Sequence, residues 1–328
     1  HGGRLLFVMN WNNDRDHFDG RVFHNPDPAA RARPLSDVWK WYRARRPAPW
    51  PRWIENGAPH PVPEGAPGRI SATWIGHSSF LLRIGAITLL TDPVFALHAG
   101  PFGRFGPRRV RAPGLPLEAL PGIDVILQSH NHYDHLDLAA HDALARRHAP
   151  MVVTPLGNRA YLPAPARPRT TELDWWGSHA PMPGVRITAV PAQHFSARTP
   201  WDRDRALWAG FVVEAEGARV YFAGDSGYGA HFGEIGRRFP GIDVALLPIG
   251  AYEPRWFMGP VHVDPAQAVQ AHLDVGARTS VAMHFGTFQL TDEGIDAPVE
   301  ELRRELDCRG IDHDRFRVPS TGGTITLD

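Results

Sequence analysis

The chain has 328 residues, and its 35 basic and 35 acidic side chains give a formal net charge of zero. This balance argues against a nucleic-acid partner, because proteins that bind phosphate backbones normally carry a basic excess. The single cysteine, Cys308, excludes an internal disulfide framework and a cysteine-rich zinc site, and no apolar run approaches the roughly 20 residues that span a bilayer. The 18 histidines are the feature that these totals leave unexplained.

Residues 1–68 are predicted to form an irregular N-terminal arm. Frequent prolines interrupt this stretch and leave room for one helix, at about 36–46. The arm either packs over the core by its aromatic rings or rests with its aromatic and arginine side chains at a membrane interface. Five of the eleven tryptophans lie in it: Trp11, Trp39, Trp41, Trp50 and Trp53.

From residue 69 onward, apolar β-branched runs alternate with helical patterns. The first three runs are separated by glycine or polar turns, which predicts a β-meander. We predict strands at 70–75, 80–84, 87–91, 123–128, 151–154, 185–191, 210–215, 220–223, 244–248, 280–284 and 324–327, and helices at 138–148, 231–238, 265–275 and 298–308. This alternation predicts an α/β fold of two sheets with helices on their outer faces, formed by one domain, 69–328, on which the arm packs.

The segment 128–137, Gln-Ser-His-Asn-His-Tyr-Asp-His-Leu-Asp, directly follows a predicted buried strand. His130 and His132 are two residues apart, so in an extended segment they point the same way, about 6–7 Å apart, and can share one metal ion. Asp134 and His135 follow a turn and are placed to serve a second ion. Nitrogen and oxygen ligands without thiolate suit zinc, iron or manganese. A loop of solvated histidines is the alternative, but such a loop need not follow a buried strand at a sheet edge.

Three later strands end in the same kind of side chain. His194 ends one strand, Asp225 follows another in a glycine-flanked turn, and His284 ends a third. Each is weak alone, because a single strand-end histidine is more often an ordinary polar residue than a ligand. Together they repeat one arrangement, an apolar strand that delivers a ligand at its end, and this repetition favours a two-metal site.

The ordered set of these seven residues resembles the metal-binding motifs of the metallo-β-lactamase-fold hydrolases. The resemblance covers about residue 69 to the C-terminus, and it implies an αββα sandwich with two divalent metal ions at one rim. Zinc is the expected metal, with iron or manganese as alternatives. The implied ligands are His130, His132 and His194 for the first ion, Asp134, His135 and His284 for the second, and Asp225 as the bridge.

Further segments resemble one branch of that superfamily, the zinc phospholipase D that acts on N-acyl-phosphatidylethanolamine, together with its bacterial relatives. The run 248–258, Pro-Ile-Gly-Ala-Tyr-Glu-Pro-Arg-Trp-Phe-Met, is the most discriminating, and 18–26 resembles the arm of the bacterial relatives. The sequence departs from the pattern at 259–261, Gly-Pro-Val, where polar residues are expected. The other matching segments are 73–79, 129–137, 224–228, 262–265 and 284–288.

The branch resemblance implies a reaction and the residues that serve it. A hydroxide held between the two metals would attack phosphorus and release phosphatidic acid and an N-acylethanolamine. His262 would contact the phosphate or the leaving oxygen, and Asp134 would move a proton as well as ligate. The alternative for His262 is a helix-capping neighbourhood beside Asp264. Substrate-binding candidates in the same loop are Tyr252, Glu253, Arg255 and His262; Arg255 could equally pair with a structural carboxylate.

Three residues fit positions behind the ligands, where an acceptor fixes the tautomer and orientation of a ligating imidazole: His77, Asp92 and Asp137. Asp92 precedes Pro93 and could instead cap a turn.

Two other functions share these motifs. A metal-dependent lactonase or another phosphodiesterase would use the same metal pair, because the pair polarises carbonyl and phosphoryl oxygens alike. A metal-stabilised binding module would be expected to lack a ligand, and all seven positions are filled. A phospholipid substrate implies peripheral membrane contact, on a side of the membrane that the sequence does not assign, and the family resemblance suggests a homodimer.

Overall fold

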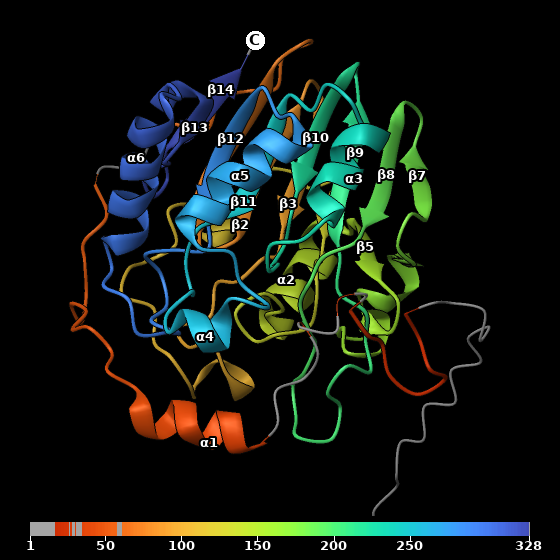
Figure 1. Ribbon diagram of the computed structural model, residues 1–328. Helices are drawn as coiled ribbons and strands as arrows, with labels where there is room; N and C mark the ends of the chain where they lie inside the picture. The colour runs from red at the N-terminus through yellow and green to blue at the C-terminus, as the bar shows by residue number, and fades with distance from the viewer. Residues whose placement is uncertain (1–16, 26, 28–29, 31–34, 58–60, 328) are drawn as a thin grey trace, which may run out of the picture.

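The structure is a computed structural model that describes residues 17–25, 27, 30, 35–57 and 61–327. Two seven-stranded sheets pack face to face, and helices cover their outer faces (Figure 1). The predicted fold class, an α/β sandwich of two sheets between helices, is confirmed. Among the described residues, no helix has the length and the apolar composition that crossing a membrane requires.

The first sheet has the strand order β14-β1-β2-β3-β4-β5-β6. β1, β2 and β3 form the predicted antiparallel meander, and β3 through β6 run parallel to one another. Its strands are β1 (Ile70–Gly76), β2 (Ser79–Ile84), β3 (Ile87–Thr91), β4 (Val125–Leu127), β5 (Met151–Pro155), β6 (Thr170–Leu173) and β14 (Thr324–Leu327).

The second sheet has the order β13-β12-β11-β10-β9-β8-β7. β7 to β10 are antiparallel, whereas β10 to β13 are parallel. Its strands are β7 (Ser178–Met182), β8 (Val185–Val190), β9 (Gly210–Ala215), β10 (Ala218–Phe222), β11 (Val244–Pro248), β12 (Thr279–Met283) and β13 (Phe316–Arg317).

The helices are α1 (Leu35–Ala44), α2 (Leu138–His148), α3 (His231–Arg238), α4 (Arg255–Met258), α5 (Pro265–Val275) and α6 (Ala297–Arg309). Leu144 of α2 packs in an apolar cluster with residues of the first sheet, and α3, α5 and α6 bury residues in the main core with the second sheet. α5 begins at a capping box formed by Asp264 and Gln267, which satisfies backbone N–H groups at its first turn.

Three strands and one helix were not predicted. β6 and β7 have the sequences TTEL and SHAPM, which lack an alternating apolar pattern, and β7 is an edge strand that tolerates Pro181. β13 has two residues and α4 has four, which is too short for a periodic signal. The predicted helix at 36–46 is present as α1, shifted by one or two residues at each end.

The arm contributes to both the core and the rim. Phe23 is buried in the main core, and the Trp50 indole N–H donates to the carbonyl oxygen of Glu293. Trp11, also assigned to the arm, lies outside the described residues. α1 lies at the same edge of the sandwich as α4 (Figure 1).

Candidate metal centre

The predicted ligands follow strands that end at one edge of the sandwich. Residues 128–137 follow β4, Asp225 follows β10 and His284 follows β12, and these three strands each run parallel to a neighbour. His194 follows β8 by four residues. Because the carboxyl ends of parallel strands meet at the same edge, residues 150 positions apart in the sequence become neighbours.

His130, His132 and His194 form one group. The His132 Nδ1 atom lies 2.9 Å from His130 Nε2 and 3.2 Å from His194 Nε2. These separations are close to the edge length of a tetrahedron around an ion with bonds of about 2.0–2.1 Å to imidazole nitrogen. Burial lowers the pKa of His132 to about 4 and the pKa values of His130 and His194 well below their usual range, so all three rings are neutral at neutral pH. The three rings therefore have the charge state that a divalent ion requires.

The Nδ1 atoms of His130 and His194 each have a hydrogen-bond partner. Because Nδ1 then carries the proton of the neutral ring, the Nε2 atom is left as an acceptor. Ser129 donates its hydroxyl to Asp92, at 2.5 Å, and so accepts from His130 Nδ1–H, at 2.9 Å. His194 Nδ1–H donates to the Val261 carbonyl oxygen, at 2.9 Å. Both Nε2 lone pairs then point at His132 Nδ1, which can donate to only one of them. A shared cation satisfies this arrangement better than hydrogen bonds do.

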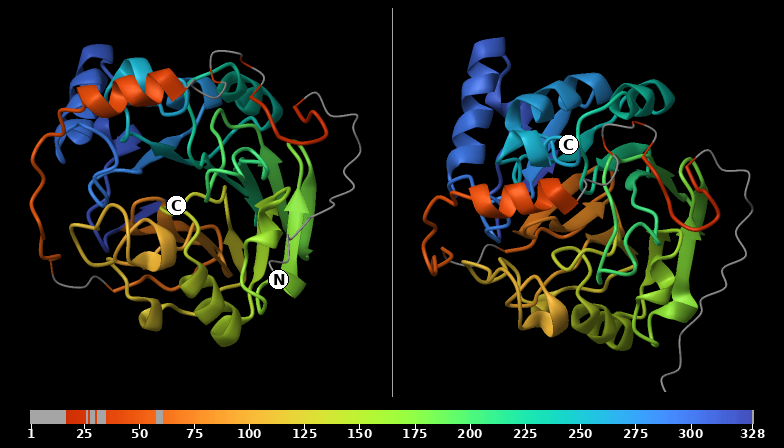
Figure 2. Two further views of the ribbon diagram at one scale, coloured as in Figure 1. Left: turned by 90° about the horizontal axis from the view of Figure 1, so that it is seen from below. Right: turned by 60° about the horizontal axis from the view of Figure 1, so that its bottom comes forward.

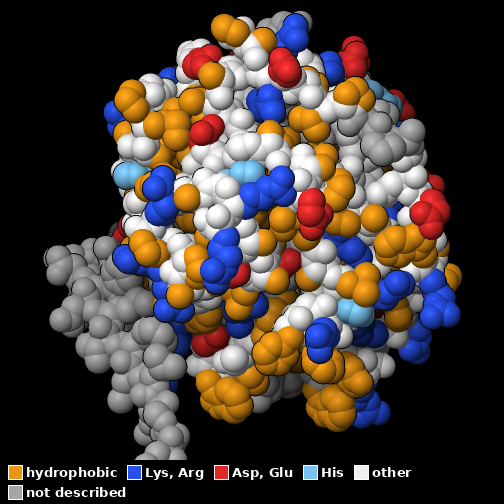
Figure 3. All heavy atoms as spheres, turned by 180° about the vertical axis from the view of Figure 1, so that it is seen from behind, with side chains coloured by type: hydrophobic (Ala, Val, Ile, Leu, Met, Phe, Trp, Pro, Cys, Tyr) orange, Lys and Arg blue, Asp and Glu red, His pale blue; other side chains and the backbone are white. Residues whose placement is uncertain are grey.

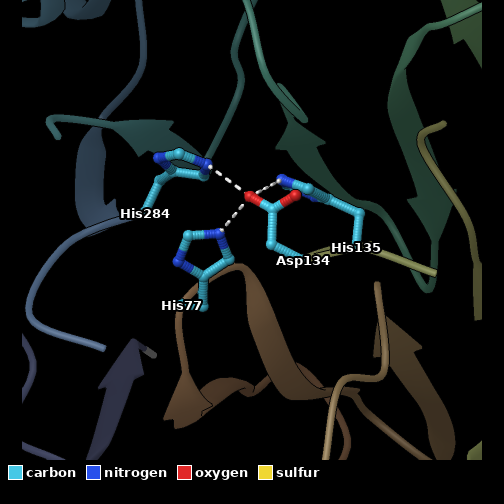
Figure 4. A group of neighbouring side chains, drawn as sticks. All are labelled: His77, Asp134, His135 and His284. Carbon is cyan, nitrogen blue, oxygen red and sulfur yellow. Dashed lines mark hydrogen bonds and ion pairs between the residues drawn. The ribbon is translucent and has the colours of Figure 1, made fainter. Parts of the chain in front are cut away.

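Asp134, His135 and His284 form the second group, with His77 beside them (Figure 4). The Asp134 Oδ2 atom is 3.0 Å from His77 Nε2 and 3.5 Å from the Nε2 atoms of both His135 and His284. His77 donates to this carboxylate, and burial lowers the pKa of His77 to about 3, which keeps its ring neutral. One carboxylate oxygen thus faces three imidazoles from three different segments.

Asp225 lies between the two groups. Its Oδ2 atom is 3.0 Å from His284 Nε2, 3.1 Å from His135 Nε2 and 3.7 Å from His194 Nε2. Burial alone would raise the pKa of Asp225, but His135 and His284 hold it well below its usual range. This is the placement expected of a bridging carboxylate.

Unpartnered polar atoms test whether metal ions fit this donor set. His135 Nε2, His284 Nε2 and Asp225 Oδ1 are buried without a hydrogen-bond partner among the described residues. The two imidazole nitrogens are close to Asp225 Oδ2, but their direction does not suit a hydrogen bond. Buried polar atoms rarely stay unpaired, and all three are typical metal ligands. The donor set therefore fits two divalent ions of the zinc, iron or manganese type.

Of the three residues predicted behind the ligands, His77 and Asp92 contact ligands. Asp92 is fully buried and accepts from His135 Nδ1 at 2.6 Å and from the Ser129 backbone N–H at 2.7 Å. Asp137 contacts no predicted ligand, so the structure corrects its role. Its carboxylate caps α2 and accepts from the backbone N–H groups of Phe95 and Ala96.

The sequence did not indicate the residues that hold the ligand loop through hydrogen bonds to its backbone. Gln128 donates its side-chain amide to the carbonyl oxygens of His130 and His135, and Arg198 donates from its Nη1 atom to those of Asn131 and Leu136. Backbone contacts of this kind depend on the folded loop and leave no spacing signal.

The arm also supports a ligand. Asn25 donates to the His194 carbonyl oxygen, at 2.6 Å, and accepts from the His194 backbone N–H, at 3.1 Å. Asn25 lies within the segment 18–26 that resembles the arm of bacterial relatives, so the resemblance was the available signal.

The metal groups open into a largely apolar cavity of about 370 Å³. Its wall includes His132, Asp134 and Asp225 at one end, and Trp41 of α1 and Phe257 of α4 at the other. The Trp41 and Phe257 rings stack 5.1 Å apart. The cavity thus joins a polar, ligand-rich end to an aromatic one.

His262 lines this cavity, whereas the other three predicted substrate-binding residues do not. The His262 ring lies 5.0 Å from that of His194, and burial lowers its pKa to about 4. Tyr252 is buried and donates its hydroxyl to Glu301, which removes it from the cavity wall.

Arg255 and Glu253 take structural roles. Arg255 pairs with Glu253, Asp264 and Glu301, so its guanidinium is engaged by three carboxylates. The alternative of a structural carboxylate partner is therefore the correct one for Arg255, and the pocket assignment of both residues is corrected.

Comparison with known proteins shows which families this chain resembles. The sequence model of the β-lactamase superfamily domain matches residues 88–285. An uncharacterized protein of Mycobacterium tuberculosis is 38% identical over 318 residues, which cover 93% of this chain and 82% of that protein. A Caenorhabditis elegans protein named N-acyl-phosphatidylethanolamine-hydrolyzing phospholipase D 1 is 37% identical over 249 residues, which cover 73% of this chain and 70% of that protein.

Among solved structures, a metallo hydrolase from the archaeon Ignicoccus hospitalis has a TM-score of 0.60 with 23% identity. The match covers 79% of this chain and 99% of that chain, and at this identity it bears on the fold alone. The residues matched by the domain model include all seven predicted ligands.

Proposed function

Because this chain belongs to the metallo-β-lactamase superfamily and is a metal-dependent hydrolase, we propose that it hydrolyses N-acyl-phosphatidylethanolamine-type phospholipids with a pair of zinc ions. The products would be phosphatidic acid and an N-acylethanolamine. Water adds its oxygen to phosphorus, the bond from phosphorus to the N-acylethanolamine oxygen breaks, and a proton ends on the released alcohol. The main support for the proposal is that the two metal groups adjoin an apolar cavity. A long-chain phosphodiester needs a metal site for its phosphate and an apolar surface for its chains.

Bound divalent ions would supply Lewis acidity and a water of lowered pKa, so that a nucleophile exists at neutral pH. The residues of the chain do the positioning. Asp225 lies between the two imidazole groups, and Asp92 and Ser129 fix the orientation of His135 and His130. This rigidity keeps the reacting groups in place without reorganisation during the reaction.

Asp134 and His262 are the candidates for proton transfer and substrate contact. Asp134 lines the cavity and is oriented by the His77 N–H, so one of its oxygens can exchange a proton with the reacting water. His262 is neutral at pH 7, and its ring can offer one N–H to a phosphoryl or leaving oxygen. Its Nδ1 atom is buried without a hydrogen-bond partner among the described residues.

The apolar end of the cavity would take acyl chain. Trp41, Phe257 and Met258 lie there, and apolar chains gain free energy when they leave water for such a surface. This arrangement supports a binding mode in which the phosphate lies at the metal end and the hydrocarbon extends toward α1 and α4.

A substrate panel tests the proposal. Purified protein is assayed with N-acyl-phosphatidylethanolamine, phosphatidylcholine, a cyclic nucleotide and an acyl-homoserine lactone. We expect the N-acylated phospholipid to be cleaved fastest, and in isotopically labelled water the label should enter phosphatidic acid. Cleavage of the lactone alone would contradict the proposal, and label in the N-acylethanolamine would contradict attack at phosphorus.

A further inference from the structure

The wall of the cavity beside the metal groups includes one lysine or arginine side chain among the described residues, that of Arg203. The two acidic residues in the same wall, Asp134 and Asp225, belong to the metal groups and are predicted ligands. Figure 3 shows Lys and Arg side chains spread over the back of the molecule with Asp and Glu among them, so an exposed arginine alone is ordinary. A cation in the cavity wall, with no anion of the wall left to pair with it, requires an explanation.

Arg203 lies on a turn whose backbone is held on both sides. The Asp202 carboxylate accepts from the Thr199 backbone N–H, at 2.7 Å. The Asp204 carbonyl oxygen accepts from the backbone N–H of Phe23 in the arm, at 2.8 Å. The turn lies at the lower edge of the sandwich in Figure 1, the edge that faces the viewer in Figure 2, left. The backbone at Arg203 is therefore in place before a substrate binds.

The Phe195 ring contacts both the guanidinium and two predicted metal ligands. The Arg203 guanidinium carbon lies 4.4 Å from the centre of this ring, which is a cation–π distance. The same ring lies 4.4 Å from the ring of His132 and 4.9 Å from that of His194. A substrate whose phosphate lies at these ligands would bring its neighbouring atoms close to the guanidinium.

The guanidinium keeps most of its donors for a ligand. Its side chain is 43% exposed, and the Asp204 carboxylate oxygen lies 3.5 Å from its Nε atom, beyond the usual hydrogen-bond length. In the described part of the chain, no other carboxylate is within ion-pairing distance of it. Arg255 differs, because three carboxylates engage its guanidinium. The planar fork of Arg203 is thus free to bind a carboxylate of a ligand.

We propose that Arg203 binds a second anionic group of the substrate, a carboxylate close to the phosphate that the metal groups would hold. Arg203 can act in this way only if the proposed function places the scissile phosphate at those groups. The preferred lipid would then be an N-acylated phospholipid of the phosphatidylserine type, which has a carboxylate that N-acyl-phosphatidylethanolamine lacks. Because the cavity is largely apolar, a charge pair there is screened less than one on open surface.

Soluble phosphodiesters test the recognition of charge without a lipid. Three substrates share a p-nitrophenyl leaving group and differ in the second aryl group, which carries a carboxylate, a carboxamide or an aminomethyl substituent. We expect kcat/KM for the carboxylate to exceed that for the carboxamide by about tenfold, mainly through KM, as for one charge-assisted contact. The ratio should shrink with added salt. Equal kcat/KM values for the three substrates would overturn the proposal.

Variants at Arg203 test whether this side chain is the source of the preference. Arg203→Gln should abolish the preference, Arg203→Glu should reverse it in favour of the aminomethyl substrate, and Arg203→Lys should keep part of it, because a lysine retains the charge without the fork. The ratio of kcat/KM values for two substrates cancels any difference in the fraction of folded protein.

The matched control is Arg205→Gln, which removes the same charge from the same turn. Arg205 is exposed and does not line the cavity. The control should keep the tenfold ratio. An equal loss of the ratio in Arg205→Gln and Arg203→Gln would overturn the assignment, because the preference would then reflect the general charge of the turn.

A lipid competition separates this proposal from the proposed reaction. N-acyl-phosphatidylserine and N-acyl-phosphatidylethanolamine are mixed in nonionic detergent micelles, and we expect faster cleavage of the first by the unmodified chain but not by Arg203→Gln. A charge preference on the soluble diesters without cleavage of either lipid would leave the role of Arg203 standing and reject the proposed reaction. Cleavage of both lipids without any charge preference would do the reverse, and cleavage of no substrate would overturn both.

Discussion

The two ends of the cavity are built in opposite ways. At the metal end, the predicted ligands are mostly buried, and Asp92, Ser129 and Gln128 restrain the segment that carries four of them. At the aromatic end, the Trp41 and Phe257 rings stack on each other, and Trp256 of α4 is 42% exposed. One end is fixed before a substrate arrives, whereas the other offers apolar surface to a substrate.

This difference follows from the demands on each end. A reaction that develops charge is accelerated by groups that are already oriented, so restraint is useful around the metals. Under the proposed reaction, the hydrocarbon of the substrate would leave a lipid phase, so apolar surface would be useful at the other end. Changes at the metal end should therefore affect turnover, and changes at the aromatic end should affect the affinity for a long-chain substrate.

The largest effect is expected from Asp225→Asn. The substitution removes the charge that lies between both imidazole groups, so kcat/KM should fall by roughly a thousandfold or more while the fold persists by circular dichroism. The matched change away from the metal groups is Asp292→Asn, at a carboxylate that pairs with Arg45, and it should alter kcat/KM little. Similar losses from the two substitutions would show that the effect is not specific to the metal end.

A smaller loss is expected from Arg198→Met. Arg198 holds the ligand loop through two carbonyl oxygens, and loss of such support typically lowers activity or metal affinity by about 10–100-fold. Arg255→Met is the control, because Arg255 pairs with carboxylates away from the cavity wall. It should lower the melting temperature with little effect on kcat/KM. An activity loss equal to that of Arg198→Met would restore the predicted substrate role of Arg255.

The metal end could be predicted from the sequence to a greater extent than the other end of the cavity. The strands before His130, Asp225 and His284 contain short apolar runs that lead up to the ligands, so their ends and their ligands could be located. The role of Tyr252 could not be predicted, and for Arg255 the sequence left a phosphate and a structural carboxylate open, because it does not show that Glu301 approaches the loop from α6.

Two further features depend on contacts between distant segments. Asp137 is two residues from His135, yet its carboxylate turns away to cap α2. The exposed rings of Trp39, Phe102, Trp201 and Trp256 come from four segments, of which the sequence drew attention to the arm and to the run 248–258 but not to the other two. Proximity along the chain predicted the metal groups because ligands cluster within one loop, and it failed where tertiary packing selects the partner.

At the aromatic end, Trp41→Ala should raise KM for a long-chain substrate by about tenfold, because it removes apolar surface from the cavity wall. The turnover of a soluble phosphodiester should stay unchanged. Trp41→Phe retains a ring that can stack on Phe257 and should keep most of the affinity. A fall in kcat for the soluble substrate in Trp41→Ala would show that the aromatic end and the metal end are coupled.

The smallest effect is expected from a buried histidine that lies away from the cavity. It tests whether burial of a titratable side chain is enough to make the fold sensitive to acid. His272 is fully buried beside Ser280, and burial lowers its pKa to about 4, below the unfolded value of about 6.5. Between these values the unfolded chain binds more protons, so stability falls as pH decreases from about 6.5 to about 4.

His272→Gln removes this titration. The stabilities of the variant and the unmodified chain are first compared at pH 8, and the difference is corrected for. After this correction, the pH midpoint of acid unfolding should be lower for the variant by roughly half a unit. Acid unfolding followed by tryptophan fluorescence measures the shift. A midpoint that moves upward after this correction would contradict the assigned direction.

The central claim is that seven side chains from four segments hold two divalent ions at the edge of the sandwich. Elemental analysis of protein purified without added metal tests it most directly, together with activity before and after treatment with a chelator. The account predicts about two equivalents of metal per chain, mainly zinc, and activity that is lost on chelation and restored by zinc. A metal-free protein with full hydrolase activity would contradict it.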